Sequence, residues 1–176
     1  LDNLPTAPRE KFAANIAAIQ KLKEIEQRVA NGGSPAFEDE QKILAQYTGW
    51  GGLSDAFDPN KSAWSNEYSQ LKAALSESEY EAARSSTLTA FYTSATVIHP
   101  IYRALERFGV KGGKILEPSM GTGAFLAHGH FGSSDAKFYG VELDSITGRI
   151  SKQLYQKANI QVTGYENALL PDNYFD

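Results

Sequence analysis

The fold of this chain is decided by residues 117–125, which read EPSMGTGAF. Residues 114–116 (KIL), which begin a predicted short strand, come directly before this stretch, and a helical pattern begins near Thr122. A strand that passes through two closely spaced glycines into a helix is typical of parallel α/β proteins that bind nucleotide-like ligands. Gly121 and Gly123 let the backbone approach a ligand closely, and the amide groups at the start of the helix attract an anion.

The sequence on either side of this stretch predicts the rest of an α/β unit. Upstream, a helix is expected to begin after Ser94 and to end at Phe108, with Pro100 either kinking it or marking its first turn. The other elements are expected at residues 114–117, 137–143 and 159–163 for strands and at residues 122–128 and 145–157 for helices. Strands and helices that alternate at this spacing predict right-handed crossovers and a parallel sheet.

The first 90 residues predict helices and no strand. One helix is expected to begin near Pro8 and to end before residues 31–33, where two glycines follow an asparagine. A second is expected between residues 34–35 (SP) and Gly49. Two more are expected to begin at Ser65 and after the capping-box pattern SESE, which ends at residue 79.

Residues 48–53, which read TGWGGL, interrupt this helical pattern. Three glycines around Trp50 indicate turns with positive φ and close backbone approach, with the indole ring as an anchor. A packed corner between helices is the favoured interpretation. A platform on which nucleic-acid bases stack is the alternative, although no basic residues are interleaved with the tryptophan.

Composition excludes several kinds of site. The 176 residues include no cysteine, so disulfides, thiolate nucleophiles and Cys-ligated metal centres cannot form. The net charge of −4 provides no overall basic surface for nucleic acid. No apolar run approaches the ~20 residues that span a bilayer, so we expect no membrane contact and a cytoplasmic location. His128 and His130 lack a nearby carboxylate cluster, so no metal site is expected.

The charges around the glycines indicate what kind of ligand would fit. Glu142 lies 21 residues after Gly121, at the end of the next predicted strand, where a carboxylate can accept hydrogen bonds from ribose hydroxyls. Leu126 stands where a dinucleotide motif needs glycine or alanine, which disfavours NAD and FAD. Glu117 would repel a phosphate. A ligand that carries both an ammonium and a carboxylate resolves this conflict, and S-adenosylmethionine has that arrangement.

Four segments resemble the adenine-N6 DNA methyltransferases. Residues 117–125 resemble their cofactor motif E-P-[SA]-x-G-x-G-x-F, and residues 91–94 (FYTS) resemble their F-Y-T-P element, with serine in place of proline. Residues 139–144 (YGVELD) match their G-x-E-x-D segment, and Glu166 resembles the acidic residue that receives the adenine amino group. The resemblance implies a partial Rossmann-like, S-adenosylmethionine-dependent methyltransferase sheet with three parallel strands. The cofactor-binding residues that it implies are Tyr92, Thr93, Glu117, Pro118, Ser119, Gly121, Gly123, Phe125, Glu142, Leu143 and Glu166.

The N-terminal region adds a second resemblance. Residues 50–53 (WGGL), 80–88 (YEAARSSTL) and 91–93 (FYT) together are similar to the large methylase–helicase proteins of bacterial conjugative elements. The implied organisation is a helical region at 1–90 and the S-adenosylmethionine-binding half of a methyltransferase domain at 91–176. We expect a helicase of the SNF2 type in the same polypeptide.

The resemblance also implies what this chain lacks. The family's catalytic N-P-P-[FY] motif is expected just past Asp176, so no catalytic residue is expected here and the chain alone would not transfer a methyl group. Together with its start at Leu1, this suggests a piece of a longer protein that methylates adenine N6 in DNA. The alternative is a catalytically idle module that positions DNA or regulates the helicase. A methyltransferase for protein or small molecules is a disfavoured third interpretation.

The same resemblance predicts an exposed sheet edge. In this fold the first strand normally pairs with the strand that follows Phe175. Without that strand the edge is open, and open edges attract another chain or a covering helix. We therefore expect either a homodimer through this edge or the N-terminal helices folded over it.

Overall fold

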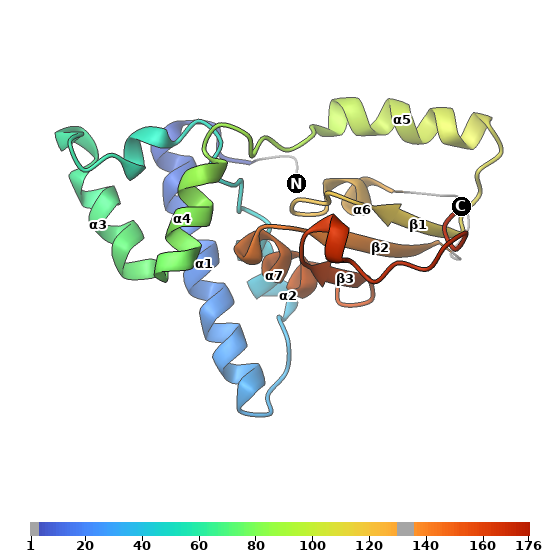
Figure 1. Ribbon diagram of the computed structural model, residues 1–176, viewed down its shortest axis with the longest axis horizontal. Helices are drawn as coiled ribbons and strands as arrows, with labels where there is room; N and C mark the ends of the chain where they lie inside the picture. Colours follow the sequence, from blue (N-terminus) through green and yellow to red (C-terminus); the bar gives the residue numbers. More distant parts are fainter. Residues whose placement is uncertain (1–3, 130–135) are drawn as a thin grey trace. The chain divides into compact units, whose positions relative to one another are not determined.

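The computed structural model describes residues 4–129 and 136–176 (Figure 1). It divides into two compact units, Leu1–Phe91 and Tyr92–Asp176. Between residues 4 and 91 the chain forms helices and no strand, as predicted. These are α1 (Pro8–Ala30), α2 (Glu38–Leu44), α3 (Ser65–Ala74), α4 (Glu77–Ser86) and the short 3-10 helices η1 (Ser54–Phe57) and η2 (Ser62–Trp64).

Helix α1 confirms the sequence prediction most closely. Pro8 is its first residue, a position that tolerates a missing backbone N–H. Phe12, Ile19 and Leu22 recur at helical spacing and are buried against the other helices of the unit. The helix ends at Ala30, and Gly32 follows with a φ of 82°, which a residue without a β-carbon adopts at little cost.

Helix α2 is shorter than predicted. It begins at Glu38 rather than at residues 34–35, and it ends at Leu44, five residues before Gly49. Its start is determined by Glu40, whose carboxylate accepts hydrogen bonds from Arg28 of α1 at 2.7 and 2.6 Å and from the Phe37 amide at 2.9 Å. These bonds hold the pKa of Glu40 well below its usual value, at about 2.

Helix α4 has the predicted capping box. The Glu79 amide donates to Ser76 Oγ at 3.3 Å, and the Ser76 amide donates to the Glu79 carboxylate at 2.9 Å. Each bond pairs a backbone N–H that the start of a helix would otherwise leave without a partner.

Trp50 is the centre of the helical unit. It is 1% exposed, and its ring lies 5.3 Å from that of Phe57 and 6.1 Å from that of Phe12. Asn15 of α1 holds the preceding turn, because its buried side chain donates to the Gly49 carbonyl at 2.7 Å. The packed-corner interpretation is therefore confirmed. The stacking-platform alternative is wrong, since a buried indole cannot reach a base.

The second unit is mixed α/β with a parallel three-stranded sheet (Figure 1). The strands lie in the order β1-β2-β3, and Glu117 pairs with Gly140 and Glu142 with Val162. The elements are α5 (Ala95–Arg107), β1 (Lys114–Glu117), α6 (Ala124–His128), β2 (Lys137–Glu142), α7 (Ser145–Leu154), β3 (Asn159–Val162) and the 3-10 helix η3 (Tyr165–Asn167). The predicted order of strands and helices is confirmed, although α6 and α7 are shorter than expected.

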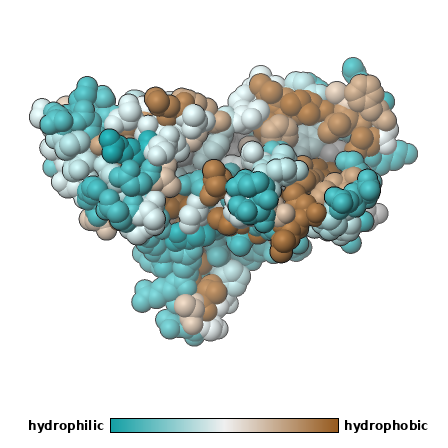
Figure 2. Space-filling view, in the orientation of Figure 1, coloured by the Kyte–Doolittle hydropathy of each residue, from teal (hydrophilic) through white to brown (hydrophobic). Residues whose placement is uncertain are grey.

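Helix α5 has two apolar stripes. Ile98 and Tyr102 are buried and pack against Ile115 of β1 and Phe138 of β2. A second stripe, with Val97 and Ile101, faces solvent and continues to Phe108 directly after the helix, which is 84% exposed. Figure 2 shows hydrophobic side chains along α5. Pro100 lies in the second turn of α5, which continues through it, so the prediction that it marks the first turn is wrong.

The outer edge of β1 is not fully open. The Asp176 amide donates to the Lys114 carbonyl at 3.1 Å, and the Lys114 amide donates to the Asp176 carboxylate at 2.9 Å. The beginning of this edge is thus bonded within the chain, which corrects the expectation of a bare edge. A homodimer at the rest of it stays a prediction. No helix in residues 4–129 or 136–176 is both long and apolar enough to cross a membrane.

Candidate functional site

The candidate site begins with the loop that joins β1 to α6. Gly121 and Gly123 both have positive φ, 55° and 79°, as their spacing predicted. Gly123 directly precedes α6, and its amide already donates to the Met120 carbonyl at 2.8 Å. Because α6 has only five residues, its dipole is weaker than the sequence suggested. The loop therefore allows a ligand to approach the backbone closely, but it is not a strong site for an anion.

Two tyrosine rings pack against these glycines. A β-carbon at Gly121 would come within 2.9 Å of the Tyr92 ring, and one at Gly123 would collide with the Tyr155 ring. Both positions thus need glycine for packing as well as for backbone conformation. Burial raises the pKa of Tyr155 to about 12 and that of Tyr92 further still, so both rings carry neutral hydroxyls.

Glu142 lies on the glycine loop. One carboxylate oxygen accepts from the Gly121 amide at 2.7 Å, and the other accepts from the Asp144 amide at 2.8 Å. Burial raises the pKa of the half-buried Glu142, and these hydrogen bonds oppose the shift. The Leu143 amide is a third backbone donor to this carboxylate, which leaves capacity for one hydroxyl donor.

Glu117 ends β1 at the same edge of the sheet. It pairs in register with Gly140 of β2, so Glu117 and Glu142 both leave the carboxyl ends of adjacent parallel strands. Burial raises the pKa of Glu117, and the Ser119 amide partly offsets this by donating to it. The next two residues, Pro118 and Ser119, are exposed. Two carboxylates in partly dehydrated surroundings make this edge attractive to a cation or to hydroxyl donors.

Tyr92 is tied to the start of α7. Its hydroxyl lies 3.3 Å from Thr147 Oγ1, which also contacts the Asp144 carboxylate at 2.5 Å. Asp144 caps α7 by accepting from the Thr147 amide at 2.8 Å. The structure thus places Tyr92 against the loop, whereas the side chain of the neighbouring Thr93 is exposed.

The remaining predicted residues are divided between core and surface. Phe125 packs in the apolar cluster around Tyr102, with ring centroids 6.2 Å apart. Leu143, which follows β2, is 77% exposed. Glu166 is exposed in η3, where its carboxylate accepts from the Asn167 side chain at 3.0 Å. The structure therefore gathers Tyr92, Gly121, Gly123 and Glu142 and leaves Thr93, Leu143 and Glu166 on the surface.

Sequence reasoning missed the contribution of α7. Ser151 is buried and donates from Oγ to the Gly121 carbonyl at 2.8 Å. Thr147, one turn earlier, holds Tyr92, and Tyr155 at the end of the helix contacts Gly123. The signal was present in the sequence, because Thr147 and Ser151 are polar residues four apart on the apolar face of an amphipathic helix.

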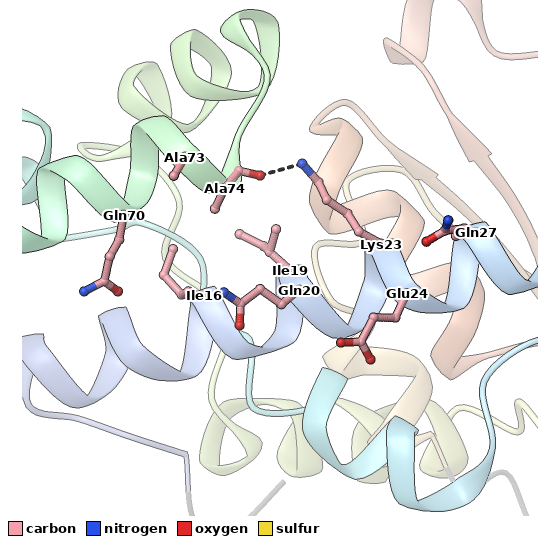
Figure 3. A pocket seen from close by; sticks show the side chains of 9 residues that line it. All are labelled: Ile16, Ile19, Gln20, Lys23, Glu24, Gln27, Gln70, Ala73 and Ala74. Carbon is pink, nitrogen blue, oxygen red and sulfur yellow. Dashed lines mark hydrogen bonds between the residues drawn. The ribbon is translucent and has the colours of Figure 1, made fainter.

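Two other features involve none of these loop residues. His99 Nε2 and His128 Nδ1 are 3.3 Å apart, but within residues 4–129 and 136–176 no group of three His, Asp or Glu side chains could hold a metal, and His130 lies outside the described residues. In the helical unit, a groove of about 500 Å³ lies between α1 and α3 (Figure 3). Lys23 points across it to the Ala74 carbonyl at the end of α3 (Figure 3).

Comparison with known proteins gives one distant relative. No model of a known family and no solved structure matches the chain. Over 146 residues, 82% of its length, the chain is 25% identical to the defense against restriction protein B of Escherichia phage P1. The matched region is 5% of that protein, so the chain spans a small fraction of its relative's length.

Proposed function

We propose that the unit Tyr92–Asp176 is the S-adenosylmethionine-binding part of an adenine-N6 DNA methyltransferase domain within a longer protein. The observation that carries this proposal is the hydrogen bond between the Glu142 carboxylate and the Gly121 amide. It places an acidic side chain against a glycine loop at the carboxyl end of a parallel sheet, which is where α/β proteins bind nucleotide-like ligands.

The side chains fit the charges of that cofactor. Glu142 can accept a hydrogen bond from a ribose hydroxyl through its remaining lone pair. Glu117 is half-buried with a raised pKa, and a ligand ammonium beside it would stabilise its ionised form. Leu143 offers an exposed apolar surface beside Glu142, and Glu166 an exposed carboxylate for the adenine amino group.

The reaction itself needs residues outside this chain. S-adenosylmethionine supplies an electrophilic methyl group on a sulfonium centre. In the proposed domain, Glu117, Glu142 and the glycine loop hold and orient the cofactor, and Tyr92 covers the loop. The sequence includes no Asn-Pro-Pro, so we expect cofactor binding without methyl transfer from this chain alone.

The phage relative suggests a setting for this activity. Its name assigns it to defence against restriction. The adenine amino group is one of the donors read in the major groove of DNA, and a methyl group on it changes what a sequence-reading nuclease encounters. We propose DNA as the substrate of the longer protein, a cytoplasmic location, and a linked helicase as its partner.

A catalytically idle module is the second candidate. The observation in its favour is that the rings of Tyr92 and Tyr155 already pack on the glycine loop. Such a module would position DNA or regulate the helicase without a cofactor. The two candidates differ in whether the loop admits a ligand.

Calorimetric titration of S-adenosylhomocysteine into this chain separates them. We expect binding by the unchanged chain and affinity weakened at least about tenfold in Glu142→Gln, because the ribose contact is charge-assisted. Gly121→Val is expected to remove binding altogether. Glu106→Gln, an exposed carboxylate on α5, is the matched control and should bind like the unchanged chain. Equal affinities for the unchanged chain and Glu142→Gln would contradict the site.

A further inference from the structure

The chain after β3 forms a loop that is closed by one side chain. Residues 163–168 leave the sheet, form η3 and return, so that Leu169 lies beside Gln161. Gln161 Nε2 donates to the Leu169 carbonyl at 3.0 Å, and Gln161 Oε1 accepts from the Leu169 amide at 2.9 Å. The side-chain amide of Gln161 is thus bonded, through its nitrogen and its oxygen, to the backbone carbonyl and amide of Leu169.

This pairing resembles a rung of a sheet. A primary amide carries the same donor and acceptor as a peptide group, so Gln161 pairs with Leu169 as a neighbouring strand would. Among the strands described, β3 is an outer one, with β2 on its other side. The side chain of Leu169 is 86% exposed, so the loop is held here by hydrogen bonds and not by apolar packing.

The loop carries Glu166 at its tip. At its outgoing end the loop is bonded to the sheet, because the Thr163 amide donates to the Glu142 carbonyl of β2 at 2.9 Å. The bonds beyond it are turns: the Asn167 amide donates to the Gly164 carbonyl at 3.0 Å, and the Ala168 amide donates to the Tyr165 carbonyl at 3.1 Å. Such turns shape the loop but do not fix it to the sheet. On its return side, the Gln161–Leu169 pair therefore determines where Glu166 lies relative to the end of β3.

We propose that Gln161 is a positioning residue that sets selectivity for adenine by holding Glu166 in place, an inference that rests on the proposed function. Glu166 would accept from the amino group of adenine, and a displaced carboxylate would lose that contact while the ribose contact at Glu142 remains. Leucine has a similar volume but can make neither bond. Asparagine is one methylene shorter and cannot reach both groups of Leu169.

The experiment compares two ligands that differ at the relevant group. S-adenosylhomocysteine carries the amino group, and S-inosylhomocysteine carries an oxygen in its place. We expect the unchanged chain to prefer the adenine compound by at least about tenfold, because a polar site rejects a ligand that leaves it unpaired. In Gln161→Leu and Gln161→Asn this preference should fall to about threefold or less, through weaker binding of the adenine compound alone. Asn159→Ala, at the exposed start of the same strand, is the matched control and should keep the full preference.

Hydrogen exchange of the Leu169 amide supplies an independent measurement. It should be slow in the unchanged chain and fast in Gln161→Leu, with the amides of β2 unaffected. Equal weakening of both ligands in Gln161→Leu would overturn the proposal, because it would show a general loss of structure. A lack of S-adenosylhomocysteine binding by the unchanged chain would instead overturn the proposed function and, with it, this inference.

Discussion

Glu142 and Gly121 are 21 residues apart in the chain and meet through a hydrogen bond of 2.7 Å from the Gly121 amide to the Glu142 carboxylate. The bond joins the end of β2 to the loop that follows β1. It is formed because parallel neighbouring strands present their carboxyl ends at one edge. The chemistry proposed for this unit depends on that juxtaposition.

Substitutions of Tyr92 test whether its ring covers a bound ligand or occupies the place of one. Tyr92→Phe keeps the ring and loses only the contact with Thr147, so we expect S-adenosylhomocysteine affinity to change by less than about threefold. Tyr92→Ala removes the ring that packs on Gly121. It should weaken S-adenosylhomocysteine binding about tenfold, because the apolar surface that covers the loop is lost. Tighter binding by Tyr92→Ala, measured by calorimetry, would favour the idle module.

Glu117 is expected to lower the stability of the chain at neutral pH. Burial raises the pKa of Glu117 above 4.5, because the folded protein favours the neutral carboxyl over the charged one. The contribution of the neutral carboxyl to stability is complete below pH 4.5 and is lost as the pH rises through the folded-state pKa. Glu117→Gln should therefore raise the free energy of unfolding at pH 7 by about 0.5 kcal/mol, a small value because water screens the half-exposed group. At pH 4, urea denaturation should show no gain in the free energy of unfolding of Glu117→Gln over the unchanged chain. A loss of stability at pH 7 would contradict this.

Glu40 should have the opposite pH dependence. Its pKa is lowered from 4.5 to about 2, first by its hydrogen bonds from Arg28 and then by the Phe37 amide. Its contribution is present above pH 4.5 and is lost as the pH falls toward 2. Urea denaturation should show Glu40→Gln to be less stable than the unchanged chain at pH 7, with the difference closing between pH 4.5 and 2. If the two free energies of unfolding differed by the same amount over that pH range, the ionised Glu40 carboxylate would not be the source of the difference.

Asn15 is expected to be important for the helical unit. It is fully buried, donates to the Gly49 carbonyl at 2.7 Å and accepts from the Thr48 amide at 2.8 Å. Asn15→Leu leaves both backbone groups buried without partners, which should cost about 3 kcal/mol in free energy of unfolding. Gln20→Leu, at an exposed position of the same helix, is the control and should change stability by less than about 0.5 kcal/mol.

Local sequence patterns determined much of this structure. The capping box at Ser76, the start of α1 at Pro8 and the two positive-φ glycines of the β1–α6 loop depend on residues within one turn of each other, so their energetics can be judged from sequence. The parallel sheet follows from the alternation of strands and helices. The meeting of Glu142 with the glycine loop follows from the sheet.

Only the tertiary structure decided the contacts between distant residues. Helix α2 begins at Glu38 because Arg28 reaches Glu40 from another helix, and Asp176 bonds to Lys114 from 62 residues away. Likewise, the role of Gln161 becomes visible only once the loop returns to it. Each of these bonds depends on how the elements pack. The residues next to a side chain in the sequence carry no information about which distant group it will meet. The sequence by itself therefore determined the elements and the position of the candidate site, whereas packing decided which side chains hold that site in place.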